Sequence, residues 1–325
     1  MSVDSKAWLH FTEPGAMGEC VAFAADLLDG FATARVQGAM QNATTNTDLV
    51  APQAAGDSFA KRKAAQSLYG SPMRYLIDQM VPVAIARECP KEAKMLDIGC
   101  GAGRYALYFI DAGVRGEYVG MDIDTQKWTD ENLPEGFSRR FVQFDAHKLG
   151  DWPEQVDFAV SLTAYEHFED DLAVSKGLAK VLKPGGKAII VVPSHWSYAL
   201  YGEHGFRRYS AGSIRRQMAE AGLEVVRIEK IGGAFSWLFH FLWFFPAHAT
   251  RMVGKTLIFG VHGMNKDKAR ANFPRLLSFL DNLGSYHLRT AFGRALHKMG
   301  ILTTTALDKA LPIMEVGYIA VVRRP

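Results

Sequence analysis

The stretch that decides the fold is MLDIGCGAGRYALYF, residues 95–109. A short apolar run ends at Gly99, and Gly101 and Gly103 follow before a helical pattern begins. Glycine has no Cβ, so such a turn lets backbone N–H groups and a helix N-terminus approach a ligand closely. The spacing is GxGxG, unlike the GxGxxG of dinucleotide-binding enzymes, and Asp97 lies two residues before the first glycine. The stretch predicts a strand, a ligand-binding turn and a helix.

Apolar segments of strand length alternate with helical or turn-rich segments along the rest of the chain. This alternation is typical of βαβ units and of a mostly parallel α/β sheet covered by helices. Continuous apolar runs such as AIIVV at 188–192 indicate strands that are buried on both faces. The expected strands lie at 94–99, 117–122, 139–144, 156–161, 186–192, 223–231 and 316–322.

Four segments with different composition follow one another along the chain. Residues 1–60 combine an Ala-rich helical pattern with a linker-like stretch, and we expect them to form an N-terminal helical extension. The ligand-binding core is expected at 61–231. A helical insertion at 232–312 separates it from its last strand at 313–325, and roughly 80 residues far exceed the usual strand connection.

Composition excludes several classes of protein. The chain has 325 residues, of which 48% are hydrophobic and 22% charged, so a wholly disordered or collagen-like chain is excluded. The three cysteines are far apart and lack the spacing of a zinc site, and no compact cluster of metal-ligand residues is visible. We therefore expect no metal. The start of the chain lacks the pattern of a secretory signal, which predicts a cytoplasmic protein.

Acidic residues follow two further predicted strands. Asp122 ends the strand in EYVGMDID, where a carboxylate can accept hydrogen bonds from both hydroxyls of a ribose. Asp145 ends the strand in FVQFDAHKL, where an acid can accept a hydrogen bond from an adenine amino group. Each acid alone is typical of a helix cap or a solvated strand end. Together with Asp97 and one glycine turn, they predict a nucleoside site.

These motifs make the chain resemble the class I S-adenosylmethionine-dependent methyltransferases. The matching segments come in the family's order, cover about residues 68–231, and are completed by the final strand EVGYIAVVRR. The resemblance implies a Rossmann-like seven-stranded sheet of order 3-2-1-4-5-7-6, with the last strand antiparallel. The segments are LDIGCGAGR (96–104), VGMDID (119–124), FDAHKL (144–149), FAVSLTAYEHFED (158–170) and LAKVLKPGGKAIIVVP (178–193).

The resemblance also implies that S-adenosyl-L-methionine is the cofactor and assigns residues to it. Asp97 and the glycine turn would hold the methionine part, and the strand end at 161–163 would lie beside the sulfonium. The glycines of Pro184–Gly186 would end the preceding helix and turn the chain into the fifth strand. The expected cofactor contacts are Asp97, Gly99, Gly101, Gly103, Asp122, Ile123, Asp145, Ala146, Leu162 and Thr163.

Methyl transfer needs a nucleophile aligned with the methyl–sulfur bond, and a hydroxyl acceptor gains from a general base. Three histidines are candidates for this base. His167 follows the fourth strand, His195 the fifth, and His204 lies in YGEHGFRRYS ahead of a helix. The alternative for His167 is a helix-start residue bonded to backbone. In the same segment, Arg207 and Arg208 would grip an acidic acceptor or be solvated charges.

The insertion begins with an apolar segment, and its nature stays open between two alternatives. Residues 231–250 hold two tryptophans and only His240 and His248 as ionisable groups. A single membrane crossing is impossible because the last strand must return to the sheet, and Pro246 is expected to break the segment. The segment is then a lid or dimer face, or an interfacial helix followed by the net +7 block at 251–310. The second alternative predicts peripheral contact with the inner face of a membrane through 231–260.

Taken together, the sequence predicts methyl transfer to a small-molecule or lipid-linked acceptor, at oxygen and without metal. An HxxRxY segment ahead of AGLEVV is similar to bacterial enzymes of this type. Three alternatives are a nicotinamide-dependent oxidoreductase, a non-catalytic protein that binds the same cofactor, and a nucleic-acid methyltransferase. The glycine spacing disfavours the first, the intact glycines and acids disfavour the second, and the lack of an NPPY-like signature disfavours the third. The acceptor's identity and the oligomeric state stay open.

Overall fold

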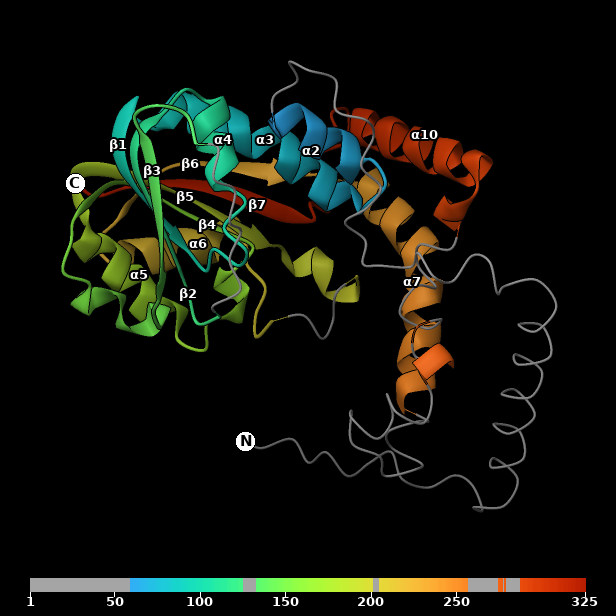
Figure 1. Ribbon diagram of the computed structural model, residues 1–325. Helices are drawn as coiled ribbons and strands as arrows, with labels where there is room; N and C mark the ends of the chain where they lie inside the picture. Colours follow the sequence, from blue (N-terminus) through green and yellow to red (C-terminus); the bar gives the residue numbers. More distant parts are fainter. Residues whose placement is uncertain (1–58, 125–132, 201–204, 257–273, 277, 279–286) are drawn as a thin grey trace, which may run out of the picture.

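The structure is a computed structural model that describes residues 59–124, 133–200, 205–256, 274–276, 278 and 287–325 (Figure 1). The N-terminal extension expected at 1–60 therefore lies outside the described residues, except for its last two positions. His204, one of the three candidate bases, also lies outside them.

A seven-stranded sheet of order β3-β2-β1-β4-β5-β7-β6 forms the centre of the molecule. All neighbouring strands run parallel except β7, which is antiparallel to both β5 and β6. The predicted fold class and strand order are confirmed. The strands are β1 (Glu92–Ile98), β2 (Arg115–Asp122), β3 (Phe137–Gln143), β4 (Val156–Leu162), β5 (Leu182–Pro193), β6 (Glu224–Ile231) and β7 (Gly317–Arg323).

Helices cover both faces of the sheet, with α3 and α4 on one side and α5 and α6 on the other (Figure 1). Successive strand residues point to opposite faces, so Met95 of β1 packs with the α3 and α4 side chains while Leu96 packs with those of α5 and α6. This double burial explains the continuous apolar runs. The helices are α2 (Phe59–Ser67), α3 (Pro72–Glu88), α4 (Ala106–Asp111), α5 (Asp171–Val181), α6 (Ala211–Glu220), α7 (Ala234–Thr256) and α10 (Ala291–Leu307).

The role expected for the glycines of Pro184–Gly186 is wrong. Helix α5 already ends at Val181, because Leu182 takes extended backbone angles and pairs with Val156 of β4. The register then shifts, so that Phe158 pairs with Lys187. The three residues therefore lie in a bulge of β5, where Gly185 has a φ of +76° and its N–H donates to the carbonyl oxygen of Arg324 at 2.9 Å.

The apolar start of the insertion forms one long helix, α7, which continues through Pro246. The prediction that this proline breaks the segment is wrong, because an interior proline removes one backbone hydrogen bond while the remaining turns keep theirs. Among the helices that the structure describes, none has the length and apolar composition needed to cross a bilayer.

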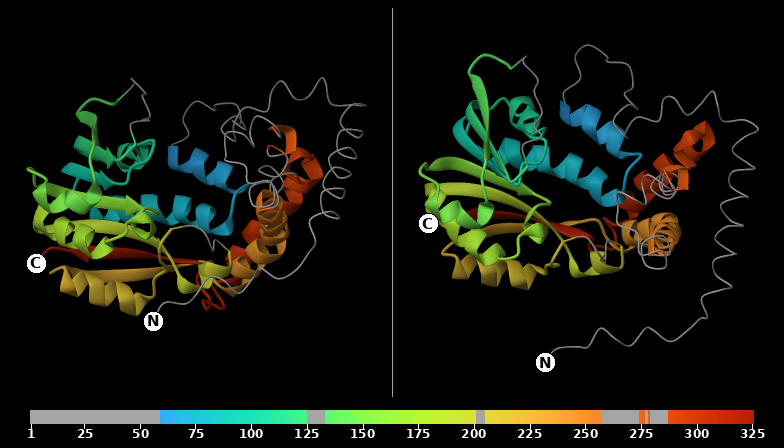
Figure 2. Two further views of the ribbon diagram at one scale, coloured as in Figure 1. Left: turned by 90° about the horizontal axis from the view of Figure 1, so that it is seen from below. Right: turned by 60° about the horizontal axis from the view of Figure 1, so that its bottom comes forward.

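Helices α7 and α10 pack together at one end of the molecule, beside α3 (Figures 1 and 2). Trp237 and Phe241 of α7 stack with ring centroids 5.1 Å apart and pack on the core, and the indole N–H of Trp237 donates to the carbonyl oxygen of Trp196 at 2.7 Å. Gly300 of α10 admits the ring of Phe239, since a Cβ there would lie 2.2 Å from that ring. One face of α7 is therefore packed against the core and against α10.

Candidate functional site

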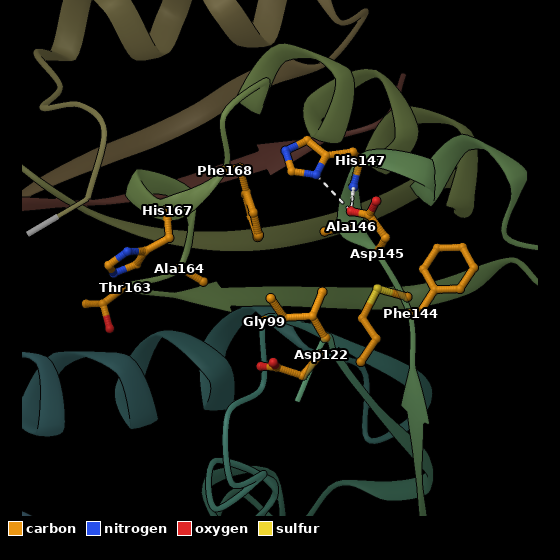
Figure 3. Close-up of a pocket in the computed structure, with 12 residues that line it drawn as sticks. Gly99, Asp122, Phe144, Asp145, Ala146, His147, Thr163, Ala164, His167 and Phe168 are labelled. Carbon is orange, nitrogen blue, oxygen red and sulfur yellow. Dashed lines mark hydrogen bonds and ion pairs between the residues drawn. The ribbon is translucent and has the colours of Figure 1, made fainter. Parts of the chain in front are cut away.

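A cavity of about 260 Å³ opens at the carboxyl ends of β1, β2 and β4 and beside the start of the 3-10 helix 146–151 (Figure 3). Ligands of open α/β sheets bind at this edge. Seven of the residues predicted from the sequence lie here: Gly99, Asp122, Ile123, Asp145, Ala146, Thr163 and His167. The remaining lining residues, which sequence reasoning missed, are Met121, Phe144, His147, Ala164 and Phe168.

The glycine turn leaves space that a side chain would fill. Gly99 has a φ of +74°, and a Cβ there would lie 2.6 Å from the Cβ of Ala164. Gly103 has a φ of +76°, and a Cβ there would lie 2.2 Å from the ring of Phe141. The turn can therefore hold only glycine at these positions without rearrangement. Gly101 and Gly103 belong to this turn but are not among the lining residues of the cavity.

The Asp122 carboxylate is hydrogen-bonded to the backbone of the glycine turn. Its Oδ2 atom accepts a hydrogen bond from the backbone N–H of Gly101 at 2.7 Å, and its Oδ1 atom accepts one from the N–H of Asp124 at 3.0 Å. Each carboxylate oxygen has a second lone pair, so the group retains capacity for the hydroxyls of a ribose. Its position is thus fixed in advance of any ligand.

Asp145 and His147 form a pair at another wall of the cavity (Figure 3). Asp145 Oδ1 accepts hydrogen bonds from the backbone N–H of His147 at 3.0 Å and lies 2.8 Å from its Nδ1. These hydrogen bonds lower the pKa of Asp145. The Nε2 atom of His147 accepts the N–H of Asp170 at 3.4 Å, which places the proton of the neutral imidazole on Nδ1. The carboxylate is therefore a charged acceptor at the cavity wall.

Thr163 lies at the end of β4 in a left-handed conformation, with a φ of +56°. For a β-branched residue this conformation is strained, and such residues concentrate at functional sites. Its N–H donates to the carbonyl oxygen of Val191 at 3.0 Å, which holds it against β5. Leu162, also predicted to contact the cofactor, points into the core and does not line the cavity.

Asp97 is buried below the glycine turn and is not among the residues that line the cavity. Its Oδ2 atom accepts a hydrogen bond from the hydroxyl of Tyr118. Burial, followed by the charge of Asp97, raises the pKa of this tyrosine. In this structure Asp97 supports the turn from behind.

The candidate bases occupy different places. His167 lines the cavity with an exposed ring, and partial desolvation followed by the charge of Arg208 lowers its pKa. His195 begins the 3-10 helix 195–199, is exposed and is not among the residues that line the cavity. Its backbone N–H donates to the carbonyl oxygen of Tyr209 at 3.1 Å. Of the two candidate bases that the structure describes, His167 is therefore the one that lines the cavity.

Glu166 precedes His167 and is buried, with 2% of its surface exposed. Burial raises the pKa of its carboxyl to about 7, against the opposing charges of Arg208 and Arg74. The segment that begins at Gly205 packs on its backbone: the N–H of Phe206 donates to the carbonyl oxygen of Glu166 at 2.6 Å. The segment 205–209 is therefore attached to the residue that precedes His167.

The two arginines of this segment are bonded to the protein. Arg207 forms an ion pair with Asp171 and donates to the carbonyl oxygen of Glu169 at 2.6 Å. Arg208 donates to the carbonyl oxygen of Arg207 at 2.9 Å and lies over the ring of Tyr198, 5.8 Å from its centroid. Within the described residues, no group of three or more His, Cys, Asp or Glu side chains is placed to hold a metal ion.

Comparison with known proteins gives the context of this site. The sequence model of a family described as "Methyltransferase domain" matches residues 69–228. The ubiquinone biosynthesis O-methyltransferase of Aliivibrio fischeri (strain MJ11) is 33% identical over 97 residues, which are 29% of this chain and 41% of that protein. The demethylmenaquinone methyltransferase of Bacillus licheniformis is 30% identical over 108 residues, which are 32% of this chain and 47% of that protein.

The chain thus spans less than half the length of these two curated relatives. Among solved structures, the cyclopropane synthase MmaA2 from Mycobacterium tuberculosis aligns with a TM-score of 0.46 and 15% identity, covering 77% of this chain and 84% of that one. The strand order and the glycine turn of this structure agree with the match to the methyltransferase domain. The chain carries, at residues 69–228, a methyltransferase domain of the class I S-adenosylmethionine-dependent family.

Proposed function

We propose that the protein transfers a methyl group from S-adenosylmethionine to an oxygen atom of a small-molecule or lipid-linked acceptor, without metal. The observation that carries the proposal is one cavity that brings together Asp122, Asp145, Thr163 and His167. Asp122 ends β2, Asp145 follows β3, and Thr163 and His167 follow β4. They offer acceptors for the cofactor and a base for the acceptor.

The residues present fit the cofactor. Asp122 offers charged acceptors to the ribose hydroxyls, and Asp145 offers one to the adenine amino group. The rings of Phe144 and Phe168 give the cavity apolar walls. The space at Gly99 admits the methionine part without a side-chain clash. When bound, S-adenosylmethionine supplies a sulfonium-linked, electrophilic methyl group.

His167 is the residue we propose as the general base. Its lowered pKa keeps the imidazole neutral near pH 7, so that a ring nitrogen can accept the proton of an attacking hydroxyl. A base of this kind contributes roughly 10²- to 10⁴-fold to the rate. The rest of the rate enhancement comes from alignment of the acceptor beside the strand end at Thr163.

The acceptor class is supported by the relatives and by the insertion. The names of the two relatives refer to quinone compounds, and one of them specifies O-methyl transfer. In this chain, Leu238 and Leu242 of α7 are exposed, although the neighbouring residues of the same helix pack on the core. We therefore extend the proposal to an amphiphilic acceptor and to peripheral contact of segment 231–260 with the inner face of the membrane.

Two measurements test the proposed activity. Titration calorimetry should show binding of S-adenosylmethionine and of its demethylated product in the micromolar range, about −8 kcal/mol. Incubation of the protein with a cell extract and methyl-labelled cofactor, followed by mass spectrometry, should show the label in an oxygen-bound methyl group. Binding of NADH in place of both compounds would overturn the proposed cofactor, and label on nitrogen or carbon would overturn the proposed atom.

A further inference from the structure

The outward face of α10 is apolar. Phe292 is 79% exposed and Met299 58% exposed, and Leu296, Leu302 and Leu307 are exposed as well. Positions three and four apart lie on one side of a helix, so Phe292, Leu296, Met299 and Leu302 form a continuous stripe. The opposite side of the helix is buried against the protein and consists of Gly293, His297 and Ile301.

This arrangement reverses the usual polarity of a surface helix, as α6 of the same molecule shows. In α6 the apolar residues Ile214 and Met218 are buried, while Arg215 and Glu220 are exposed. A helix that turns its larger apolar side chains toward solvent marks an interaction surface. Packing within the described part of the chain does not account for the stripe on α10.

Helix α7 adds a second exposed stripe on the same structural unit. Leu242 is 63% exposed, and Leu238 and Val253 are exposed too. The rings of Phe239 and Trp243 of α7 contact the ring of His297 of α10, with centroids 5.5 and 5.9 Å apart. The indole N–H of Trp243 also donates to Nε2 of His287, four residues before the start of α10, at 2.9 Å. Figure 2 shows them side by side at one end of the molecule.

A carboxylate at the end of α10 adds to this attachment. The Oδ1 atom of Asp308 accepts the backbone N–H of Phe235 at 2.9 Å and that of Ser236 at 3.3 Å, at the start of α7. An acidic group at a helix N-terminus satisfies N–H groups that have no partner within the helix. The two apolar stripes therefore belong to one rigid pair of helices.

The charges beside the α10 stripe have one sign. Between residues 287 and 311, all of which the structure describes, the charged residues are Arg289, Arg294, Lys298, Lys309 and Asp308. Asp308 is buried against α7, so the exposed charges of this region are cationic. A two-fold contact with a second copy would bring these cations together, which opposes it. An anionic surface complements them.

We propose that the outward faces of α7 and α10 form a docking surface for an anionic lipid bilayer. Phe292, Leu296 and Met299 enter the boundary between headgroups and acyl chains, and Lys298 lies among the lipid phosphates. The helices lie on the membrane, as amphipathic interfacial helices do. This inference extends the contact proposed for 231–260 to a separate helix, and it does not depend on the methyl-transfer reaction.

Vesicle co-sedimentation tests the inference with the full chain. Wild-type protein should bind vesicles of phosphatidylcholine and phosphatidylglycerol and should bind phosphatidylcholine vesicles more weakly, with the difference reduced by salt. Replacing Phe292 and Met299 together by Asp should weaken binding about 100-fold. Each substitution removes the transfer of one apolar side chain into the bilayer, which is worth about tenfold in affinity. Lys298→Glu should weaken binding to the anionic vesicles only.

Val83→Asp is the matched control, because Val83 is 63% exposed on α3, away from the stripe. This variant should bind vesicles like the wild type, and all variants should keep wild-type circular dichroism and cofactor affinity. Equal loss with Val83→Asp, or no wild-type binding to either vesicle, overturns the inference. The inference is also overturned if light scattering shows that the wild type is a dimer and that Phe292→Asp is a monomer. The stripe would then bind a second copy of the chain. If the wild-type protein does not bind S-adenosylmethionine, this result counts against the proposed function and not against the docking surface.

Discussion

The Oδ2 atom of Asp122 lies 2.7 Å from the backbone nitrogen of Gly101 and accepts its hydrogen bond. The end of β2 is thereby tied to the glycine turn that follows β1. The same carboxylate faces the cavity, so one side chain both shapes the turn and presents a charge to a ligand. The affinity of the site and the conformation of its turn are therefore coupled through this residue.

Asp122→Ala should weaken binding of S-adenosylmethionine by about 1 to 3 kcal/mol, because it removes a charged acceptor and the anchor of Gly101. Asp122→Asn keeps one amide oxygen and should recover part of this loss. Titration calorimetry measures both. Glu220→Gln, a change of an exposed acid on α6, is the control. Wild-type affinity in Asp122→Ala would show that the carboxylate has no part in binding.

Gly103→Ala should destabilise the domain by more than about 2 kcal/mol, because a Cβ would overlap the ring of Phe141 and the φ of +76° strains any other residue. Gly222→Ala separates the two effects. Its φ is +81°, but a Cβ there would meet no atom within 4 Å. It should cost about 1 kcal/mol, the strain alone. Urea unfolding of the two variants gives the comparison, and equal losses would contradict the overlap.

Glu166 should make the protein less stable as pH rises. Its pKa is raised from 4.5 to about 7 in the folded state, so the folded protein binds more protons than the unfolded chain between these values. The free energy of unfolding should fall across this window, by about 3 kcal/mol, and level off above pH 7. Glu166→Gln should remove this part of the dependence, and urea unfolding at several pH values measures it. An unchanged pH profile in the variant would contradict the raised pKa.

His167→Gln should lower the rate of methyl transfer by roughly 10²- to 10⁴-fold and leave cofactor affinity unchanged. In the wild type the rate should fall on acidification below the ordinary histidine pKa of 6.5, since the lowered pKa of His167 moves its protonation to more acid pH. Label transfer to the acceptor from a cell extract measures both. His195→Gln, a change of an exposed histidine that does not line the cavity, is the control. A larger loss in the control than in His167→Gln would assign the base elsewhere.

Excess chelator should leave the same label transfer intact. Proton removal by the neutral imidazole of His167 and alignment at Thr163 require no Lewis acid. Addition of Mg²⁺ to the treated protein is the second arm of the assay. Complete loss of transfer that Mg²⁺ reverses would contradict the proposed metal-independent reaction.

The parts of the site that lie at strand ends could be predicted from the sequence. Apolar runs fix where β1, β2 and β4 end, so Gly99, Asp122 and Thr163 fall at one edge of the sheet. His147 and Phe168 could not be predicted in this way, since His147 lies in a 3-10 helix after β3 and Phe168 directly follows a 3-10 helix after β4. Their positions depend on hydrogen bonds such as that between His147 and Asp170, which no periodicity encodes.

Helical periodicity also could not predict which side of α10 faces the protein. Phe292, Leu296 and Met299 form the more apolar stripe, so the usual rule would bury them. The structure instead buries His297, whose Nε2 lies 2.9 Å from the carbonyl oxygen of Gly70. Specific polar contacts, and the close approach permitted by Gly300, decide the orientation.

The insertion leaves and rejoins the sheet at a single point. Ile231 at the end of β6 pairs with Gly317 at the start of β7, and the N–H of Val316 donates to the carbonyl oxygen of Ile231 at 2.9 Å. β6 and β7 are thus the arms of an antiparallel hairpin with an enlarged connection. A two-residue turn can join such arms, so their ladder of hydrogen bonds is independent of the length between them. The connection between β6 and β7 can therefore differ in length without any change to the register in which these two strands pair.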